Sequence, residues 1–107
     1  MSYESKIKDQ FTDELFEAIL KLETIEECYR FFEDVCTIKE IQSISQRLGV
    51  AKLLKEGGTY NEIEKITGAS TATISRVNRC LHYGADGYKL ILQRLQVQDP
   101  EDVEQTK

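Results

Sequence analysis

The chain has 107 residues, of which 40% are hydrophobic and 31% charged, and its formal net charge is -5. This mixture is too apolar for a disordered chain and too charged for a membrane protein. The longest apolar runs have three residues, and the N-terminus lacks the apolar segment of a signal peptide. We therefore expect one cytoplasmic domain with no membrane partner.

Cysteine and histidine usage argues against metal and catalytic sites. Cys28, Cys36 and Cys80 are an odd number without CxxC spacing, so we expect buried free thiols rather than disulfides or a zinc site. His82 is the single histidine, which excludes a histidine-based metal cluster within one chain, and no nucleophile-elbow signature accompanies it. We expect no metal, no cofactor and no enzyme activity.

The charges are distributed unevenly along the chain. Residues 1–36 carry a net charge of -6, residues 37–98 carry +4, and residues 99–107 carry -3. A basic centre between acidic ends permits a surface that binds a polyanion, although it does not prove one.

Apolar spacing predicts helices from the start of the chain. Residues 9–22 repeat apolar side chains every three or four positions, which is typical of an α-helix. Thr24 with Glu27, and Thr37 with Glu40, form capping boxes that open the second and third helices. A glycine pair at positions 57 and 58 ends the third helix.

Shorter elements follow this glycine pair. A fourth helix begins after Thr59 and stops at Gly68, and a fifth begins at Ser70 or Thr71. Asp86 can cap a strongly apolar sixth helix. We therefore expect an all-α fold of six helices with no strands.

The domain boundary and the terminal helices carry two further expectations. Residues 1–98 are predicted to form a single all-helical domain, and the acidic residues 99–107 a disordered tail. The first and last helices are apolar over more than one face, which exceeds the needs of a small monomer. A second copy covering these faces would explain the excess, and packing of the two helices within one chain is the alternative.

Residues 59–82 have the pattern of a helix-turn-helix, with Gly68 supplying the turn. The residues expected to face inward are Ile63, Ile66, Ile74 and Val77. The residues that the same spacing leaves toward solvent are Thr71, Ala72, Ser75, Arg76 and Arg79. Small polar residues at a helix start suit base edges, and guanidinium groups suit phosphates, so this face is a candidate DNA-binding surface.

Other interpretations of this segment remain open. Helix-turn-helix units also serve as protein-interaction modules, and Arg76 and Arg79 can simply pair with acidic groups on the surface. Glu62 and Glu64 on the first helix would repel phosphates if they faced DNA.

The stretch from Thr37 to Leu81 resembles the Trp repressor family, and within it the small Trp repressor-like branch. The likeness is carried by Gln46-Arg47-Leu48, Leu53-Leu54, the Gly57-Gly58 break and the run from Gly68 to Arg76. It implies an intertwined homodimer whose two recognition helices read a palindromic operator in double-stranded DNA, with a repressor role. Thr71, Ala72 and Ser75 match the operator-reading positions of the family. Tyr60, Asn61 and Glu64 stand where the Trp repressor has Gln, Arg and Lys, so some phosphate contacts are missing.

The resemblance also implies a small-molecule effector pocket, formed by Thr37, Arg47, Thr73, Arg76, Val77 and Cys80. The family clamps tryptophan between two arginines, which Arg47 and Arg76 match, although a helix salt bridge is an alternative role for Arg47. Val77 replaces a glycine and Cys80 a serine. The added carbons would cost about 1–3 kcal/mol where the indole ring needs space, which argues against tryptophan as the corepressor. DNA binding without a corepressor, or a different effector, is the hypothesis that follows.

Overall fold

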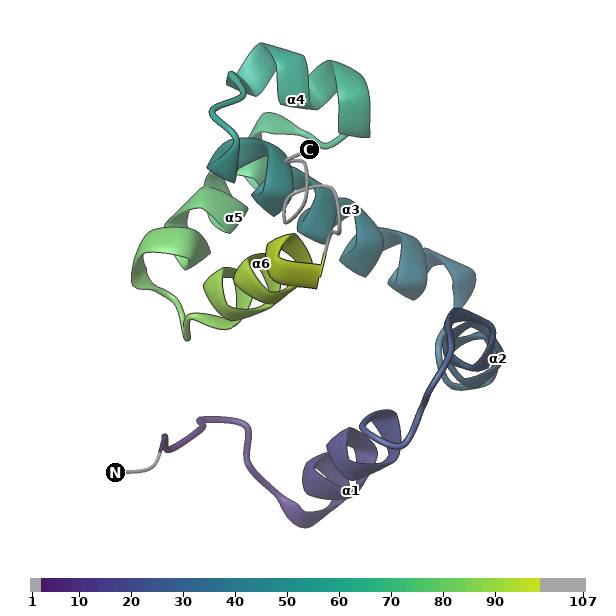
Figure 1. Cartoon of the computed structure of the whole chain (residues 1–107). Helices are drawn as coiled ribbons and strands as arrows, with labels where there is room; N and C mark the ends of the chain where they lie inside the picture. The colour runs from purple at the N-terminus through teal and green to yellow at the C-terminus, as the bar shows by residue number, and fades with distance from the viewer. Residues whose placement is uncertain (1–2, 99–107) are drawn as a thin grey trace. The chain divides into compact units, whose positions relative to one another are not determined.

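The computed structural model describes residues 3–98, which form six α-helices and no strands (Figure 1). The helices are α1 (Gln10–Ile19), α2 (Ile25–Val35), α3 (Ile38–Lys55), α4 (Tyr60–Thr67), α5 (Thr71–Tyr83) and α6 (Gly87–Gln98). The expected all-α fold is confirmed, and the tail predicted at residues 99–107 lies outside the described residues. None of the described helices is both long enough and apolar enough to cross a bilayer.

The chain divides into two compact units, Met1–Ile41 and Gln42–Lys107, with the boundary inside α3. The N-terminal unit contains α1, α2 and the first residues of α3. The C-terminal unit contains the remainder of α3 with α4, α5 and α6. The single domain over residues 1–98 stays a prediction.

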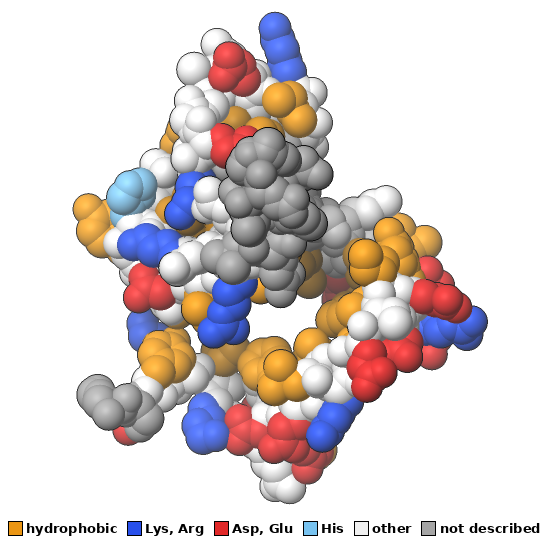
Figure 2. All heavy atoms as spheres, viewed as in Figure 1, with side chains coloured by type: hydrophobic (Ala, Val, Ile, Leu, Met, Phe, Trp, Pro, Cys, Tyr) orange, Lys and Arg blue, Asp and Glu red, His pale blue; other side chains and the backbone are white. Residues whose placement is uncertain are grey.

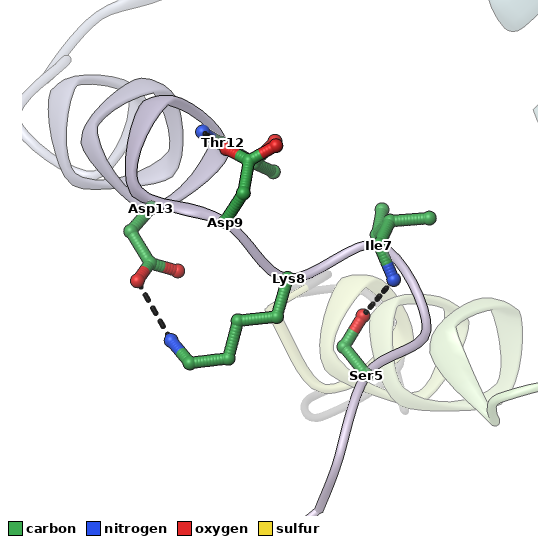
Figure 3. A network of polar contacts seen from close by, with 6 residues as sticks. All are labelled: Ser5, Ile7, Lys8, Asp9, Thr12 and Asp13. Carbon is green, nitrogen blue, oxygen red and sulfur yellow. Dashed lines mark hydrogen bonds and ion pairs between the residues drawn. The ribbon is translucent and has the colours of Figure 1, made fainter.

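Polar side chains set the start of α1 (Figure 3). Asp9 is the N-cap, and its carboxylate accepts a 2.7 Å hydrogen bond from the backbone N–H of Thr12. That bond lowers the pKa of Asp9 below its ordinary value. Next to it, the Lys8 ammonium lies 2.7 Å from the Asp13 carboxylate, and the hydrogen bond to this anion raises the pKa of Lys8.

The end of α1 comes earlier than the apolar pattern predicts. The pattern reaches residue 22, whereas the helix ends at Ile19. The N–H groups of Lys21 and Leu22 bond the carbonyl oxygens three residues back, at Ala18 and Ile19. The last turn therefore tightens into the 3₁₀-type pattern that commonly closes an α-helix.

The two predicted capping boxes differ in detail. At α3 both reciprocal bonds are present: the Thr37 hydroxyl accepts from Glu40 N–H at 3.1 Å, and the Glu40 carboxylate accepts from Thr37 N–H at 2.8 Å. At α2 the Thr24 hydroxyl accepts from Glu27 N–H at 3.1 Å. The Glu27 carboxylate reaches one residue further and accepts from Glu23 N–H. Both boxes begin helices where they are expected.

The helices α1 and α2 contain no fully buried residue. Their largest side chains are open to solvent, with Phe11 84% and Leu20 82% exposed. Figure 2 shows such apolar side chains at the surface among acidic ones. The expectation of buried thiols is wrong: the three cysteines are free, but Cys28 on α2 and Cys80 on α5 are exposed, and Cys36 is half-buried.

The C-terminal unit holds the hydrophobic core. Helix α4 packs against α5, and α5 packs against α6. Each of these helices and α3 contributes to one cluster of buried side chains, which comprises Val50, Ala51, Ile63, Ala69, Ile74, Val77 and Leu92. Partly buried leucines and Tyr88 surround this cluster.

One inward-facing residue was predicted wrongly. Ile63 is fully buried, but Ile66 is 69% exposed. The position that turns inward is instead Thr67, whose carbonyl accepts a hydrogen bond from the Gln46 side chain of α3. Thr67 is half-buried, and its hydroxyl donates a 2.7 Å hydrogen bond to the Ile63 carbonyl.

Candidate nucleic-acid interface

Local capping and one left-handed residue shape the helix-turn-helix formed by α4 and α5. Thr59 and Glu62 make a complete capping box at the start of α4. Gly68 ends α4 with φ +76°, a conformation that glycine adopts without steric penalty. Ser70 then caps α5, and its hydroxyl accepts from Thr73 N–H at 3.2 Å. The expected turn and the choice of Ser70 over Thr71 as the cap both follow from this geometry.

Packing of buried side chains fixes the angle between α4 and α5. Ile63 from α4 meets Ile74 and Val77 from α5, and all three are essentially fully buried. Val50 of α3 belongs to the same cluster. At the edge of the cluster, the Gln46 amide donates a 3.1 Å hydrogen bond to the carbonyl of Thr67 at the end of α4. Helix α3 therefore holds α4 by both apolar and polar contacts.

The five predicted DNA-contacting residues are all exposed along α5: Thr71, Ala72, Ser75, Arg76 and Arg79. Helix α5 contains no acidic residue, and basic side chains lie over it in Figure 2. Within residues 3–98, neither arginine lies within ion-pair distance of a carboxylate. The alternative that Arg76 and Arg79 pair with acidic groups on the surface therefore finds no support in the described part of the chain.

The two glutamates of α4 have separate local roles. The Glu62 carboxylate folds back to the start of its own helix, where it accepts from Thr59 N–H at 2.9 Å. Glu64 instead accepts a 3.2 Å hydrogen bond from the hydroxyl of Thr71, the first residue of α5. From the sequence, Glu64 is expected only to repel phosphates and to lack a phosphate contact of the family, and its bond to Thr71 is not predicted. No local motif signals a bond between residues seven positions apart across a turn.

The residues of the implied effector pocket differ widely in exposure. Val77 is only 1% exposed, whereas Arg76 and Cys80 are exposed. Arg47 is half-buried and makes no ion pair with any residue from 3 to 98, so the helix salt bridge considered for it is not seen there. The Thr73 hydroxyl accepts from the Ser70 hydroxyl at 3.1 Å. Thr37 belongs to the N-terminal unit, where it caps α3.

Comparison with known proteins identifies the family. The family model described as "Trp repressor protein" matches residues 10–96. The chain is 57% identical over 96 residues to the uncharacterized protein YerC of Bacillus subtilis strain 168, and the match covers 90% of this chain and 92% of YerC.

Two solved structures are similar over most of both chains. One is a candidate Trp repressor from Staphylococcus aureus, with 58% identity and a TM-score of 0.82, covering 87% of this chain and 93% of the other. The second is a TrpR-like protein from Eubacterium eligens, with 60% identity and a TM-score of 0.81, covering 84% and 93%. The protein belongs to the Trp repressor family.

Proposed function

We propose that this protein is a sequence-specific DNA-binding transcriptional regulator, with a repressor role, that uses α4 and α5 as its reading unit. The observation that carries the proposal is the outer face of α5. This face combines small residues at its start with two exposed arginines and has no acidic residue, in a chain whose net charge is -5. The family supports the same assignment, since its proteins are regulators rather than enzymes.

Each residue of this face has a role set by its place on the helix. Thr71, Ala72 and Ser75 lie toward the N-terminus of α5, the end that approaches base edges in the major groove. Arg76 and Arg79 follow on later turns, where long guanidinium side chains reach phosphates on either side of the groove. The bases would therefore be read by short side chains, and most of the affinity would come from the arginines.

We infer that the active form is a homodimer in which a second copy covers the apolar faces of α1 and α2. Phe11, Leu20, Ile25 and Tyr29 are each more than 60% exposed in a single chain. Apolar surface of this extent in one small unit is typical of an interface. A dimer with twofold symmetry would present two α5 helices to half-sites about one helical turn apart, ~34 Å, on a palindromic operator.

We infer further that tryptophan is not the corepressor. Val77 points into the core beside Ile63 and Ile74, so its side chain cannot swing aside to admit an indole ring. The same packing holds α5 in place without any ligand. The helix-turn-helix of α4 and α5 would then be held in its DNA-binding arrangement without a ligand. Alternatively, the protein would respond to an effector whose shape fits beside Val77. Arg47 and Arg76 remain the cationic groups for such an effector.

The decisive experiment incubates the protein with a pool of random DNA duplexes in the absence of tryptophan and identifies the duplexes that it binds. A salt titration on the selected site follows, because phosphate contacts make the logarithm of affinity fall linearly with the logarithm of salt. The Arg30→Ala variant is the control for loss of a positive charge away from α5, since Arg30 lies on α2 and is paired with Glu26 at 2.8 Å. It should leave the salt dependence of DNA binding unchanged. Sedimentation measures the oligomeric state of the same sample.

Enrichment of a palindromic site by a dimer supports the proposal. A folded dimer that selects no site, with or without tryptophan, overturns it. The all-helical protein-interaction module that keeps the fold without binding DNA would then be the better assignment. Exposure of Glu62 and Glu64 on α4 is the observation that favours this alternative.

A further inference from the structure

The contact between Glu64 and Thr71 brings an acidic side chain to the start of the proposed reading helix. Glu64 lies on α4, but its Oε2 atom accepts a 3.2 Å hydrogen bond from the hydroxyl of Thr71. Thr71 is the first residue of α5, directly after the Ser70 cap. A base edge that contacts Thr71 would therefore also lie close to the carboxylate of Glu64.

The carboxylate is placed there and remains available for another partner. Both Glu64 and Thr71 are exposed, and no lysine or arginine within the described ranges lies at ion-pair distance from Glu64. The first turn of α5 has no acidic residue of its own, so Glu64 supplies the negative charge that the helix N-terminus favours. An ionised carboxylate has two oxygens, and the bond from Thr71 uses one site on one of them.

An ionised carboxylate, which accepts hydrogen bonds but cannot donate them, discriminates among base edges in the major groove. Guanine presents acceptors at N7 and O6, thymine presents an acceptor at O4, and adenine presents an acceptor at N7 beside its amino group. Each of these acceptors would repel the carboxylate. Cytosine offers only the N4 amino donor on that edge, so it is the base that matches an ionised glutamate.

We propose that Glu64 is a specificity-determining residue that selects cytosine at one position of each half-site, with Thr71 as the residue that positions it. The inference rests on the proposed DNA-binding function and adds a named base to it. Glu64 then contacts a base edge from α4, beside the N-terminus of α5, in addition to the short side chains of α5 itself.

The test compares the base preferences of the parent protein and the Glu64→Gln variant over the selected operator, by binding to duplexes with each base at every position. Glutamine keeps the size of the side chain and an acceptor for Thr71, but its amide can pair bidentately with adenine N6 and N7. We expect the parent to prefer cytosine by roughly tenfold at one position per half-site. The variant should shift that preference to adenine and leave the other positions unchanged.

Two further variants separate a reading role from a structural one. Glu62→Gln is the matched control on the same helix, since glutamine also serves in a capping box, and it should leave the base profile as it is. Thr71→Val removes the hydroxyl that holds Glu64, and should weaken the cytosine preference even though the Glu64 carboxylate is retained. Circular dichroism confirms that each variant is folded.

Three outcomes would count against the proposal, and each is distinguishable. If the parent selects no DNA, the proposed function fails and this inference with it. If the parent binds but Glu64→Gln has the same base profile, only the inference fails. If Glu64→Gln raises affinity equally for all sequences, Glu64 acts only through charge repulsion, which also overturns its assignment as a reader.

Discussion

The side-chain amide of Gln46 donates a 3.1 Å hydrogen bond to the main-chain carbonyl of Thr67, twenty-one residues away. Thr67 is the last residue of α4, where helix carbonyls have no partner within the helix. The bond satisfies such a carbonyl and ties the end of α4 to α3. Gly68 begins the turn at the next residue, so this bond also fixes the place where the chain turns toward α5.

Replacement of Gln46 should therefore destabilise the helix-turn-helix. We expect Gln46→Ala to lower the free energy of unfolding by about 1 kcal/mol, the usual contribution of a partly buried hydrogen bond. Gln46→Glu should lower it more, because a carboxylate cannot donate and would face the Thr67 carbonyl. Urea denaturation measures both. Gln42→Ala, at an exposed position one turn earlier in α3, is the control and should change little.

Substitution of Gly68 should show how much the left-handed turn between α4 and α5 contributes to stability and DNA binding. A Cβ added at Gly68 meets only the Gln46 amide at 4.0 Å, so the penalty of Gly68→Ala is conformational and not steric crowding. We expect a loss of about 1–2 kcal/mol in stability, together with weaker DNA binding because α5 is displaced. Gly57→Ala is a matched control, since Gly57 also has φ +91° with open space around it but lies before α4. It should lose similar stability and retain DNA affinity.

The arginines of α5 are predicted to carry the salt dependence of DNA binding. Arg79→Ala removes one phosphate contact from each protomer of a dimer, so the slope of log affinity against log salt should become shallower by roughly 2. Affinity should fall for all sequences alike, with the base profile retained. An unchanged slope would place Arg79 away from the DNA backbone. Ser75→Ala provides the contrast: it should alter base preference and leave the slope unchanged.

Val77 is predicted to exclude tryptophan. Calorimetry should detect no tryptophan binding by the parent protein. Val77→Gly should gain it, because the glycine removes an overpacking penalty of about 1–3 kcal/mol, which corresponds to roughly ten- to hundredfold in affinity. The variant should also lose roughly 2–4 kcal/mol of stability, since a buried side chain is removed and a glycine enters a helix. Absence of any gain in a folded Val77→Gly or Val77→Ala protein would mean that more than the valine blocks the pocket.

Asp9 gives α1 a predictable dependence on pH. The hydrogen bond from Thr12 N–H lowers the pKa of Asp9, so the folded protein releases this proton more readily than the unfolded chain does. The stabilisation of α1 is therefore present above the ordinary pKa of 3.8 and is lost as the pH falls through the lowered pKa. Carboxyl resonances followed by NMR during an acid titration should show this shift. Asp9→Asn keeps the cap acceptor and should remove this pH dependence of α1 helicity.

Features that depend only on neighbouring residues are predictable from the amino-acid sequence. The caps at Thr24, Thr37 and Thr59 all begin helices, because a hydroxyl three residues before an unpaired N–H lies within reach of it. For the fifth helix the sequence leaves Ser70 and Thr71 as alternatives, and the structure selects Ser70. Gly68 and Gly57 adopt positive φ because glycine has no Cβ to oppose it. Six helices and the helix-turn-helix followed from these local signals and from the spacing of apolar residues.

Tertiary structure alone decided which side chains meet across the turn and which are covered. Thr67 rather than Ile66 faces the core, because the contact with α3 selects the position one full turn after Ile63. Glu64 reaches Thr71 because the turn at residues 68–70 brings the outer side of α4 beside the first residue of α5. These contacts depend on the relative placement of two helices, which no periodicity within either helix encodes.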